Sequence, residues 1–326
     1  MRIKYIMKTT ILITGATAIG KTEIALDVAK YLPKAEILSV DSRQIYRYMN
    51  IGTAKVNQEQ RERFPHHFLD MLNPDQKYSA GEYARAARNR IHKIWDKGGV
   101  PLLVGGTGLY WQSVYDGFFI EDEDIDSADI RNNLQQRLKD EGIAPLYKEL
   151  GDIDPIAQNR IEAGDIQRIM RCLEIVLKNG RPLGELWRTE GSTTLGCHSL
   201  MVNLTMDREK LYGRINARVD LMLEQGLVQE VESLLEMGYG HAAYAMGTMG
   251  YQEIEAYIAG RISIEEAISL IKQRTRNFAK RQLTWCRRDR RLWELNFEDW
   301  GKQGVIQRIV NGWQYRQGGD GYVDMV

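Results

Sequence analysis

The sequence has few cysteines and no excess of charge of either sign. Its three cysteines, Cys172, Cys197 and Cys286, are scattered along 326 residues and form no Cys-x-x-Cys pair. Such a set is typical of a reducing compartment and supplies neither a disulfide framework nor a zinc site. Lys plus Arg and Asp plus Glu both total 44. Net charge therefore indicates no particular partner, and local clusters have to be considered instead.

Long apolar segments are also missing. No stretch approaches the ~20 apolar residues that a membrane span needs, and the apolar run near the N-terminus is too short for a signal peptide. With 43% hydrophobic and 27% charged residues, the composition is that of a soluble globular protein, which we expect in the cytoplasm. The length predicts more than one structural unit.

Strands are predicted to alternate with helices in the first part of the chain. Apolar, β-rich runs occupy residues 11–14, 35–41 and 100–106, and residues 198–206 resemble a further strand. The alternation predicts an α/β fold with a parallel sheet. In such a fold, ligands gather at the carboxyl ends of the strands.

The character of the chain changes after about residue 118. Six acidic residues crowd positions 121–129, which we interpret as a solvated loop rather than a metal site, and short polar helices are predicted after them. From Asp207 to about Arg291 the chain is predicted to be mainly helical. We therefore expect three parts: a catalytic core of residues 8–117 and 198–300, an inserted helical domain of residues 118–197, and a tail of residues 301–326.

Residues 15–22, GATAIGKT, match the phosphate loop G-x-x-x-x-G-K-[ST] and lie between the first strand and a predicted helix. Backbone N–H groups of such a loop bind anions, Lys21 adds a positive charge, and the Thr22 hydroxyl reaches a magnesium ion. The alternative, a glycine-rich turn without a ligand, does not explain Lys21 and Thr22 together. The predicted anion site comprises Gly15, Ala16, Thr17, Ala18, Ile19, Gly20, Lys21 and Thr22.

Asp41 ends the second strand, and Gly105, Gly106 and Thr107 end the third. Because the carboxyl ends of parallel strands meet at one edge of a sheet, we expect these residues to converge with the phosphate loop. A carboxylate at this position binds magnesium, acts as a general base, or caps the following helix. The residues alone leave these three roles open.

Residues 272–291 contain nine basic residues and one acid. On a helix this segment would carry an apolar stripe of Ile271, Phe278 and Trp285, which is expected to pack on the core. It would also carry a parallel row of Arg274, Arg281 and Arg288. A basic helix with aromatic residues suits an RNA backbone, whereas a solvated surface helix usually mixes both signs.

Two other groups of arginines permit two interpretations. Arg214 and Arg218 lie four apart on one predicted helix, and Arg168 and Arg171 accompany an apolar stripe on another. Their guanidinium groups either form surface ion pairs or clamp phosphate, for which a planar fork is well suited.

Eight motifs in this order resemble the tRNA dimethylallyltransferase (tRNA isopentenyltransferase) family over roughly residues 10–291: GATAIGKT, DSRQIYRYMNIGTAK, HHFLDMLNPDQKYSAGEYARAA, LLVGGTGLY, DIQRIMR, DREKLYGRINARVDLMLEQGLVQEV, MGYQE and TRNFAKRQLTWCRR. The resemblance implies a P-loop NTPase-like core with an inserted, tRNA-contacting helical domain. It implies transfer of a dimethylallyl group from dimethylallyl diphosphate to the exocyclic amine of the adenine 3′ to the tRNA anticodon. The zinc finger of eukaryotic relatives does not appear, which indicates a bacterial-type enzyme, and we expect a monomer.

The resemblance also implies roles for individual residues. Asp41 matches the general base, and Thr22 matches a residue on the magnesium–diphosphate side. The loop with Lys21 holds the donor diphosphate, although it is often described as an ATP-binding site. For the arginine on that diphosphate we prefer Arg218 to Arg214. The implied tRNA contacts are Asp41, Ser42, Arg43, Gln44, Thr107, Gln167, Arg168, Ile169, Met170, Arg171, Gly247, Thr248, Met249, Gly250, Tyr251, Gln252, Lys280, Arg281, Gln282, Leu283, Thr284, Trp285, Cys286 and Arg287.

Four positions depart from the family pattern, and two other functions stay open. The family usually has Pro and Ser where this chain has Ala16 and Ile19, and both changes are tolerable because backbone groups bind the phosphate. It favours Ile and Lys where this chain has Met249 and Gln252, which removes one cation near the predicted tRNA contact. A small-molecule P-loop kinase would transfer phosphate from ATP without RNA, and would leave the basic helix unexplained. An RNA-binding module would bind tRNA, with its loop only sensing nucleotide, and would show no turnover.

Overall fold

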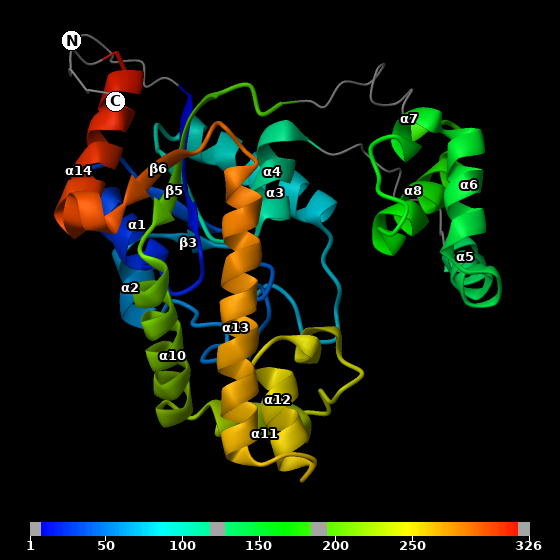
Figure 1. Cartoon of the computed structure of the whole chain (residues 1–326). Coiled ribbons are helices and arrows are strands. Elements are labelled where there is room, and N and C mark those ends of the chain that lie inside the picture. Colours follow the sequence, from blue (N-terminus) through cyan, green and yellow to red (C-terminus); the bar gives the residue numbers. More distant parts are fainter. Residues whose placement is uncertain (1–7, 118–127, 184–193, 319–326) are drawn as a thin grey trace. The chain divides into compact units, whose positions relative to one another are not determined.

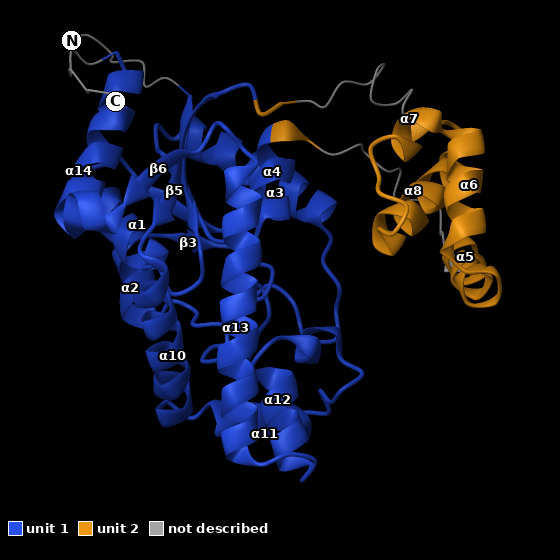
Figure 2. Ribbon diagram, in the orientation of Figure 1, with its two compact units in different colours: residues 1–115, 196–326 blue, residues 116–195 orange. Residues whose placement is uncertain are grey.

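The computed structural model describes residues 8–117, 128–183 and 194–318. The chain divides into two compact units, one of residues 1–115 and 196–326 and the other of residues 116–195 (Figure 2). The insertion was expected at residues 118–197, and each boundary of the second unit lies two residues earlier than expected. Residues 121–127 of the acidic run lie outside the described residues. The two units are considered separately.

The first unit is built on a six-stranded, all-parallel sheet (Figure 1). Its strands follow the order β3-β2-β4-β1-β5-β6. They are β1 (Thr9–Gly15), β2 (Glu36–Ser39), β3 (His66–His67), β4 (Pro101–Val104), β5 (His198–Thr205) and β6 (Trp293–Asn296). The predicted α/β fold is confirmed. The sequence did not reveal β3 and β6, which are short edge strands.

The burial of the central strand β1 explains why this strand could be predicted from the sequence. Ile11, Leu12 and Ile13 are fully buried. Ile13 is in register with Val104 of β4 on one side and with Val202 of β5 on the other. A parallel strand covered on both faces needs apolar residues at successive positions, which produces the continuous run ILI in the sequence.

Helices cover the sheet and continue past its carboxyl edge. They are α1 (Lys21–Ala29), α2 (Gln58–Arg63), α3 (Ala80–Asp96), α4 (Gly108–Asp116), α10 (Arg208–Glu224), α11 (Leu227–Glu236), the 3₁₀ helix η1 (Tyr244–Gly247), α12 (Tyr251–Ile258), α13 (Ile264–Arg287) and α14 (Phe297–Arg316). In Figure 1, α10 and α13 run beside one another, and residue contacts join these two helices and join α12 to α13.

Helix α13 is the predicted basic helix, but its buried face differs from the predicted stripe. Ile271 is buried as expected, whereas Phe278 and Trp285 are only half-buried. The buried face continues instead through Ala279, Gln282 and Cys286. A seven-residue spacing drifts by about 20° per repeat on a straight helix, so a strict heptad rotates away from the core.

The prediction of a tail from residue 301 is corrected by α14, which extends to Arg316. Val305, Ile306, Ile309, Val310 and Trp313 of this helix are buried in the core. Their spacing is that of a helix with one apolar face, and α14 packs on α1 and β5. Residues 319–326 lie outside the described residues.

The second unit is a small helical cluster of α5 (Ala128–Glu141), α6 (Ile143–Ile153), α7 (Pro155–Gln158) and α8 (Ile166–Asn179). Its core contains Leu134, Leu146, Leu150, Ile169 and Leu173. Throughout the described ranges of both units, no helix combines the length and apolar character that crossing a membrane requires.

Replacing Ile309 with Ala tests whether α14 belongs to the core. Because Ile309 is fully buried, the variant removes packed volume, and we expect the free energy of unfolding to fall by about 2–5 kcal/mol. Urea denaturation followed by circular dichroism measures the change.

Gln303 on the same helix is exposed, so Gln303→Ala serves as the control and should change the free energy of unfolding by no more than about 0.5 kcal/mol. If the Ile309→Ala variant is as stable as the Gln303→Ala variant, α14 does not belong to the core and the predicted tail is correct.

Candidate active site at the carboxyl edge of the sheet

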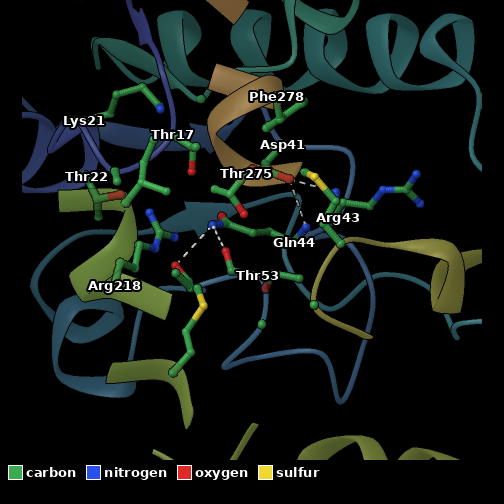
Figure 3. Close-up of a pocket in the computed structure, with 18 of the residues that line it drawn as sticks. Thr17, Lys21, Thr22, Asp41, Arg43, Gln44, Thr53, Arg218, Thr275 and Phe278 are labelled. Carbon is green, nitrogen blue, oxygen red and sulfur yellow. Dashed lines mark hydrogen bonds between the residues drawn. The ribbon is translucent and has the colours of Figure 1, made fainter. Parts of the chain in front are cut away.

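A cavity of about 750 Å³ in the first unit lies where β1, β2 and β4 end (Figure 3). The phosphate loop, the loop after β2, the turn after β4, α10, the segment before α12, and α13 all contribute to its wall. Of the residues predicted from the sequence, the cavity is lined by Thr17, Ala18, Gly20, Lys21, Thr22, Asp41, Ser42, Arg43, Gln44, Thr107, Arg214, Arg218, Gly247, Thr248, Met249, Gly250 and Arg281. The convergence expected from the strand ends is therefore observed.

The phosphate loop wraps around the ammonium group of Lys21. Its Nζ donates to the carbonyl oxygens of Gly15 at 3.1 Å and Ala16 at 2.8 Å. Gly15 has a φ of 143°, and a Cβ there would lie 2.7 Å from the Leu204 carbonyl oxygen, so only glycine fits. Gly15, Ala16 and Ile19 shape the loop without lining the cavity.

Two cations at this end of the cavity are partly stripped of water. Burial and, to a lesser extent, the nearby Arg218 lower the pKa of Lys21 to about 8, while Asp41 acts in the opposite direction. Burial also lowers the pKa of Arg218, with Asp41 again opposing. Asp41 is the carboxylate that acts on both of these desolvated cations, whereas Glu23, which also lines the cavity, pairs with Lys302. The pair of cations is therefore short of negative charge. An anion with more than one charge would stabilise it.

The two candidate arginines of α10 differ in what they contact. Arg214 is exposed, and its Nε donates to the Ala18 carbonyl oxygen at 2.9 Å, so it braces the phosphate loop. Arg218 is half-buried on the cavity wall (Figure 3). Within the described part of the chain, its guanidinium forms no hydrogen bond. This arrangement favours Arg218 for a bound anion.

Asp41 is held in place by its own loop. Its Oδ1 accepts the backbone N–H of Arg43 at 2.8 Å and of Gln44 at 3.3 Å. The residues that follow form turns rather than a helix, so the helix-cap alternative becomes a turn cap. Capping uses one carboxylate oxygen and fixes its orientation, while the group lines the cavity.

The glycines of the turn at residues 105–108, called the glycine turn, permit close contact with neighbouring segments. A Cβ on Gly105 would lie 2.1 Å from the Val40 carbonyl oxygen, and one on Gly108 would lie 2.3 Å from the Trp285 ring. Thr107 Oγ1 accepts the Ser42 N–H at 3.1 Å. The glycine turn therefore fastens the Asp41 loop to the sheet edge and lets α13 approach.

The residues of α13 that were predicted to contact tRNA lie partly on its exposed face and partly on its buried face. Lys280, Arg281, Thr284 and Arg287 are exposed. Gln282 and Cys286 are buried, while Leu283 and Trp285 are half-buried. The buried pair does not present its side chains to a partner in this structure. For the exposed and half-buried residues, contact with tRNA stays a prediction.

A carboxylate that sequence reasoning missed anchors the loop that lines one side of the cavity. Glu230 accepts the backbone N–H groups of Asn50, Ile51 and Gly52 at distances of 2.8 to 3.1 Å, and the Tyr251 hydroxyl at 2.6 Å. Tyr251 is fully buried. A Cβ on Gly52 would lie 2.5 Å from its ring. Tyr251 therefore has a structural role here, not that of an exposed contact.

Apolar residues also line the cavity, and most were missed as site residues. Val219 and Met222 come from α10, Ile271 and Phe278 from α13, and Met249 from the segment before α12. Thr53 and Thr275 add hydroxyl groups. None of these residue types signals chemistry by itself. The one available signal was helical phase, because Met222 lies four residues after Arg218 and so shares its face of α10.

In the second unit, Gln167–Arg171 lie at the start of α8. Arg171 pairs with Glu174 at 2.8 Å, Arg168 pairs with Asp165 at 3.4 Å, and Ile169 is buried. The surface ion-pair interpretation therefore holds for these two arginines in this structure. Their role in contacting tRNA stays a prediction.

A metal ion at this site would depend on oxygen ligands. Across residues 8–117, 128–183 and 194–318, no group of three or more His, Cys, Asp or Glu residues is arranged to hold one. The Thr22 hydroxyl lines the cavity together with Asp41. Magnesium keeps several waters and binds through few protein oxygens plus substrate phosphates, so this donor set fits magnesium delivered with a phosphorylated ligand.

A phosphate loop after β1, an acid after β2 and two desolvated cations define an enzyme site for a phosphorylated substrate. The sequence model of IPP transferase matches residues 44–289. A tRNA dimethylallyltransferase from Carboxydothermus hydrogenoformans is 45% identical over 303 residues, 92% of this chain and 96% of that protein. One from Bacillus anthracis is 40% identical over 300 residues, 92% and 94% of the two chains. The chain therefore belongs to the IPP transferase family, and the predicted resemblance is confirmed.

Solved structures show the same fold. The tRNA delta(2)-isopentenylpyrophosphate transferase from Staphylococcus epidermidis superposes with a TM-score of 0.69 at 37% identity, covering 94% of this chain and 99% of that one. A eukaryotic dimethylallyltransferase acting on tRNA, at 24% identity and a TM-score of 0.79, shares the fold over 97% of this chain and 81% of its own. These relatives do not favour the small-molecule kinase alternative.

The pKa of Lys21 predicts how anion binding depends on pH. In the free protein Lys21 loses its proton as pH rises through about 8, whereas a bound diphosphate favours the protonated form. The affinity for inorganic diphosphate should therefore fall above pH 8, by up to about tenfold per pH unit. Isothermal titration calorimetry between pH 7 and pH 9.5 measures it.

A Lys21→Met variant provides the control. It should bind diphosphate weakly and lose the fall in affinity above pH 8. An unchanged affinity across this pH range in the wild-type protein would show that Lys21 does not meet the anion.

Proposed function

We propose that this protein transfers a dimethylallyl group from dimethylallyl diphosphate to the exocyclic amine of the adenine 3′-adjacent to the anticodon of tRNAs. One observation carries the proposal: a single cavity combines a phosphate loop, two desolvated cations, an aspartate and an apolar wall. The names of the relatives at 45% and 40% identity agree with it.

The donor fits the cavity in one orientation. Its diphosphate lies at the phosphate loop against Lys21 and Arg218, because this end of the cavity combines the loop with two desolvated cations. Its hydrocarbon lies along the apolar residues of α10 and α13, with Val219, Met222 and Phe278 among them. The cations favour departure of the diphosphate, since negative charge grows on it as the bond to carbon breaks.

Magnesium is the cofactor that the site suits. Thr22 would supply a hydroxyl ligand, and the diphosphate would supply further oxygens. The ion neutralises part of the charge on the leaving group when it is bound. The phosphate loop, in this proposal, serves a prenyl diphosphate rather than ATP.

Asp41 acts as the general base. The adenine amine attacks the first carbon of the prenyl group, so a nitrogen–carbon bond forms while the carbon–oxygen bond to diphosphate breaks. The amine proton passes to the Asp41 carboxylate. The amine is a weak nucleophile because its lone pair is delocalised into the ring, and a positioned base typically contributes ~10²–10⁴-fold.

The tRNA approaches over the exposed side of α13. The target adenine has to leave the stack of the anticodon loop to reach the cavity, at a cost of roughly a few kcal/mol. Lys280, Arg281 and Arg287 are exposed cations that offset this cost by contacting the RNA backbone. Arg281 also lines the cavity and lies over the Phe278 ring at 5.7 Å.

Incubation with labelled dimethylallyl diphosphate, magnesium and tRNA should place the label in tRNA. An Asp41→Asn variant keeps the Oδ1 acceptor for the Arg43 and Gln44 N–H groups but cannot take the proton. Its kcat should fall by about 10²-fold or more, with substrate binding largely retained. Rapid-quench assays and binding titrations separate the two effects.

Asp75→Asn removes an exposed carboxylate and serves as the control, with wild-type kcat expected. No incorporation by the wild-type protein into any tRNA with adenine at the target position would refute the proposed function. A wild-type kcat for Asp41→Asn would leave Asp41 as a turn cap only.

Arg281→Ala tests the RNA face of α13. Loss of one phosphate contact should weaken tRNA binding and reduce the slope of log affinity against log salt by roughly 0.7 to 0.9. Filter binding at several salt concentrations measures both quantities. The donor affinity, measured separately, should change little.

Lys93→Ala on α3 removes an exposed lysine from another helix and should leave the slope unchanged. If Arg281→Ala gives the wild-type slope, Arg281 does not belong to the RNA contact.

A further inference from the structure

We propose that Gln282 is a positioning residue that joins the RNA-facing helix α13 to the phosphate loop and the glycine turn. The inference rests on the proposed function and replaces a direct tRNA contact by this side chain. Gln282 is 7% exposed. Its Oε1 accepts the Thr17 N–H at 2.8 Å, and its Nε2 donates to the Gly106 carbonyl oxygen at 3.0 Å.

This contact restricts the residue types at positions 106 and 282. A Cβ on Gly106 would lie 2.1 Å from Gln282 Nε2 and 3.1 Å from the Gly15 carbonyl oxygen. Any side chain at position 106 would therefore displace the Gln282 amide from its two hydrogen bonds. An amide carries both a donor and an acceptor. An ionised glutamate lacks the donor, and methionine lacks both.

The contact orders groups that the reaction uses. Thr17 and Thr107 both line the cavity, and Thr107 holds the Ser42 N–H next to Asp41. One buried amide thus connects the loop that binds the leaving group with the turn that supports the base. Without it, the Thr17 N–H and the Gly106 carbonyl oxygen each lose a hydrogen-bond partner.

Helix α13 also carries residues that line the cavity and residues that are exposed, on either side of Gln282. Phe278 and Arg281 line the cavity, while Lys280 and Thr284 are exposed. Contacts of tRNA with α13 and the position of the donor loop therefore depend on one rigid element. Gln282 is the side chain by which α13 is hydrogen-bonded to the phosphate loop.

Two variants separate positioning from contact with tRNA. Gln282→Met keeps the volume and removes both hydrogen bonds. We expect kcat to fall by about 10- to 100-fold, since small misplacements of reacting groups have effects of this size. The affinity for inorganic diphosphate should fall several-fold, while the affinity for tRNA should stay within about threefold of wild type.

The pH dependence of kcat in the Gln282→Glu variant distinguishes a positioning role from a purely structural one. A protonated glutamic acid matches glutamine in shape and offers the same donor and acceptor, whereas its ionised form does not. The ratio of its kcat to that of the wild-type protein should therefore rise as pH falls from 8 to 5.5. Taking the ratio removes the pH effects that both proteins share.

Ile309→Ala, in α14 and outside the cavity lining, controls for lost stability and should keep the wild-type kcat at a temperature where it is folded. A Gln282→Met variant with kcat within about twofold of wild type, or a tRNA affinity that falls while kcat does not, would overturn the inference. A Gln282→Glu ratio that does not change with pH would also overturn it. The diphosphate titration needs no tRNA, so failure of the proposed function would be recognised separately.

Discussion

The close packing of α13 against the glycine turn is the constraint on which the site depends. Side chains at Gly106 and Gly108 would collide with Gln282 and Trp285. With glycine at both positions, one helix reaches the phosphate loop, the turn after β4 and the cavity wall. The glycines of VGGTG and the Gln and Trp of RQLTW are therefore one structural feature, although about 170 residues separate them.

The electrostatics of the cavity follow from that packing. Enclosure by α10 and α13 removes water from Lys21 and Arg218, which lowers the pKa of each, and leaves Asp41 as a neighbouring negative charge. Desolvated cations are costly without a counter-ion. The same enclosure brings apolar residues beside the anion site. A donor with a charged end and a short hydrocarbon end matches both properties, and a water-exposed loop would provide neither.

Much of the fold and of the site could be predicted from local patterns. The buried strand ILI, the phosphate loop and Asp41 are signalled by residues next to one another, and topology alone predicts that they converge. Contacts between distant segments could not be predicted in this way. Glu230 is one acid among many until its contacts with Asn50, Ile51 and Gly52 are seen. The apolar pattern of α14 was hidden by the nearby glycines, and the drift of the heptad hid which face of α13 is buried.

Analysis of tRNA nucleosides tests the central claim most directly. Transfer RNA would be isolated from cells that lack this protein and from the same cells carrying it, then hydrolysed and examined by mass spectrometry. The account predicts that prenylated adenosine next to the anticodon is missing without the protein and restored with it. Equal amounts of prenylated adenosine in both samples would contradict the account.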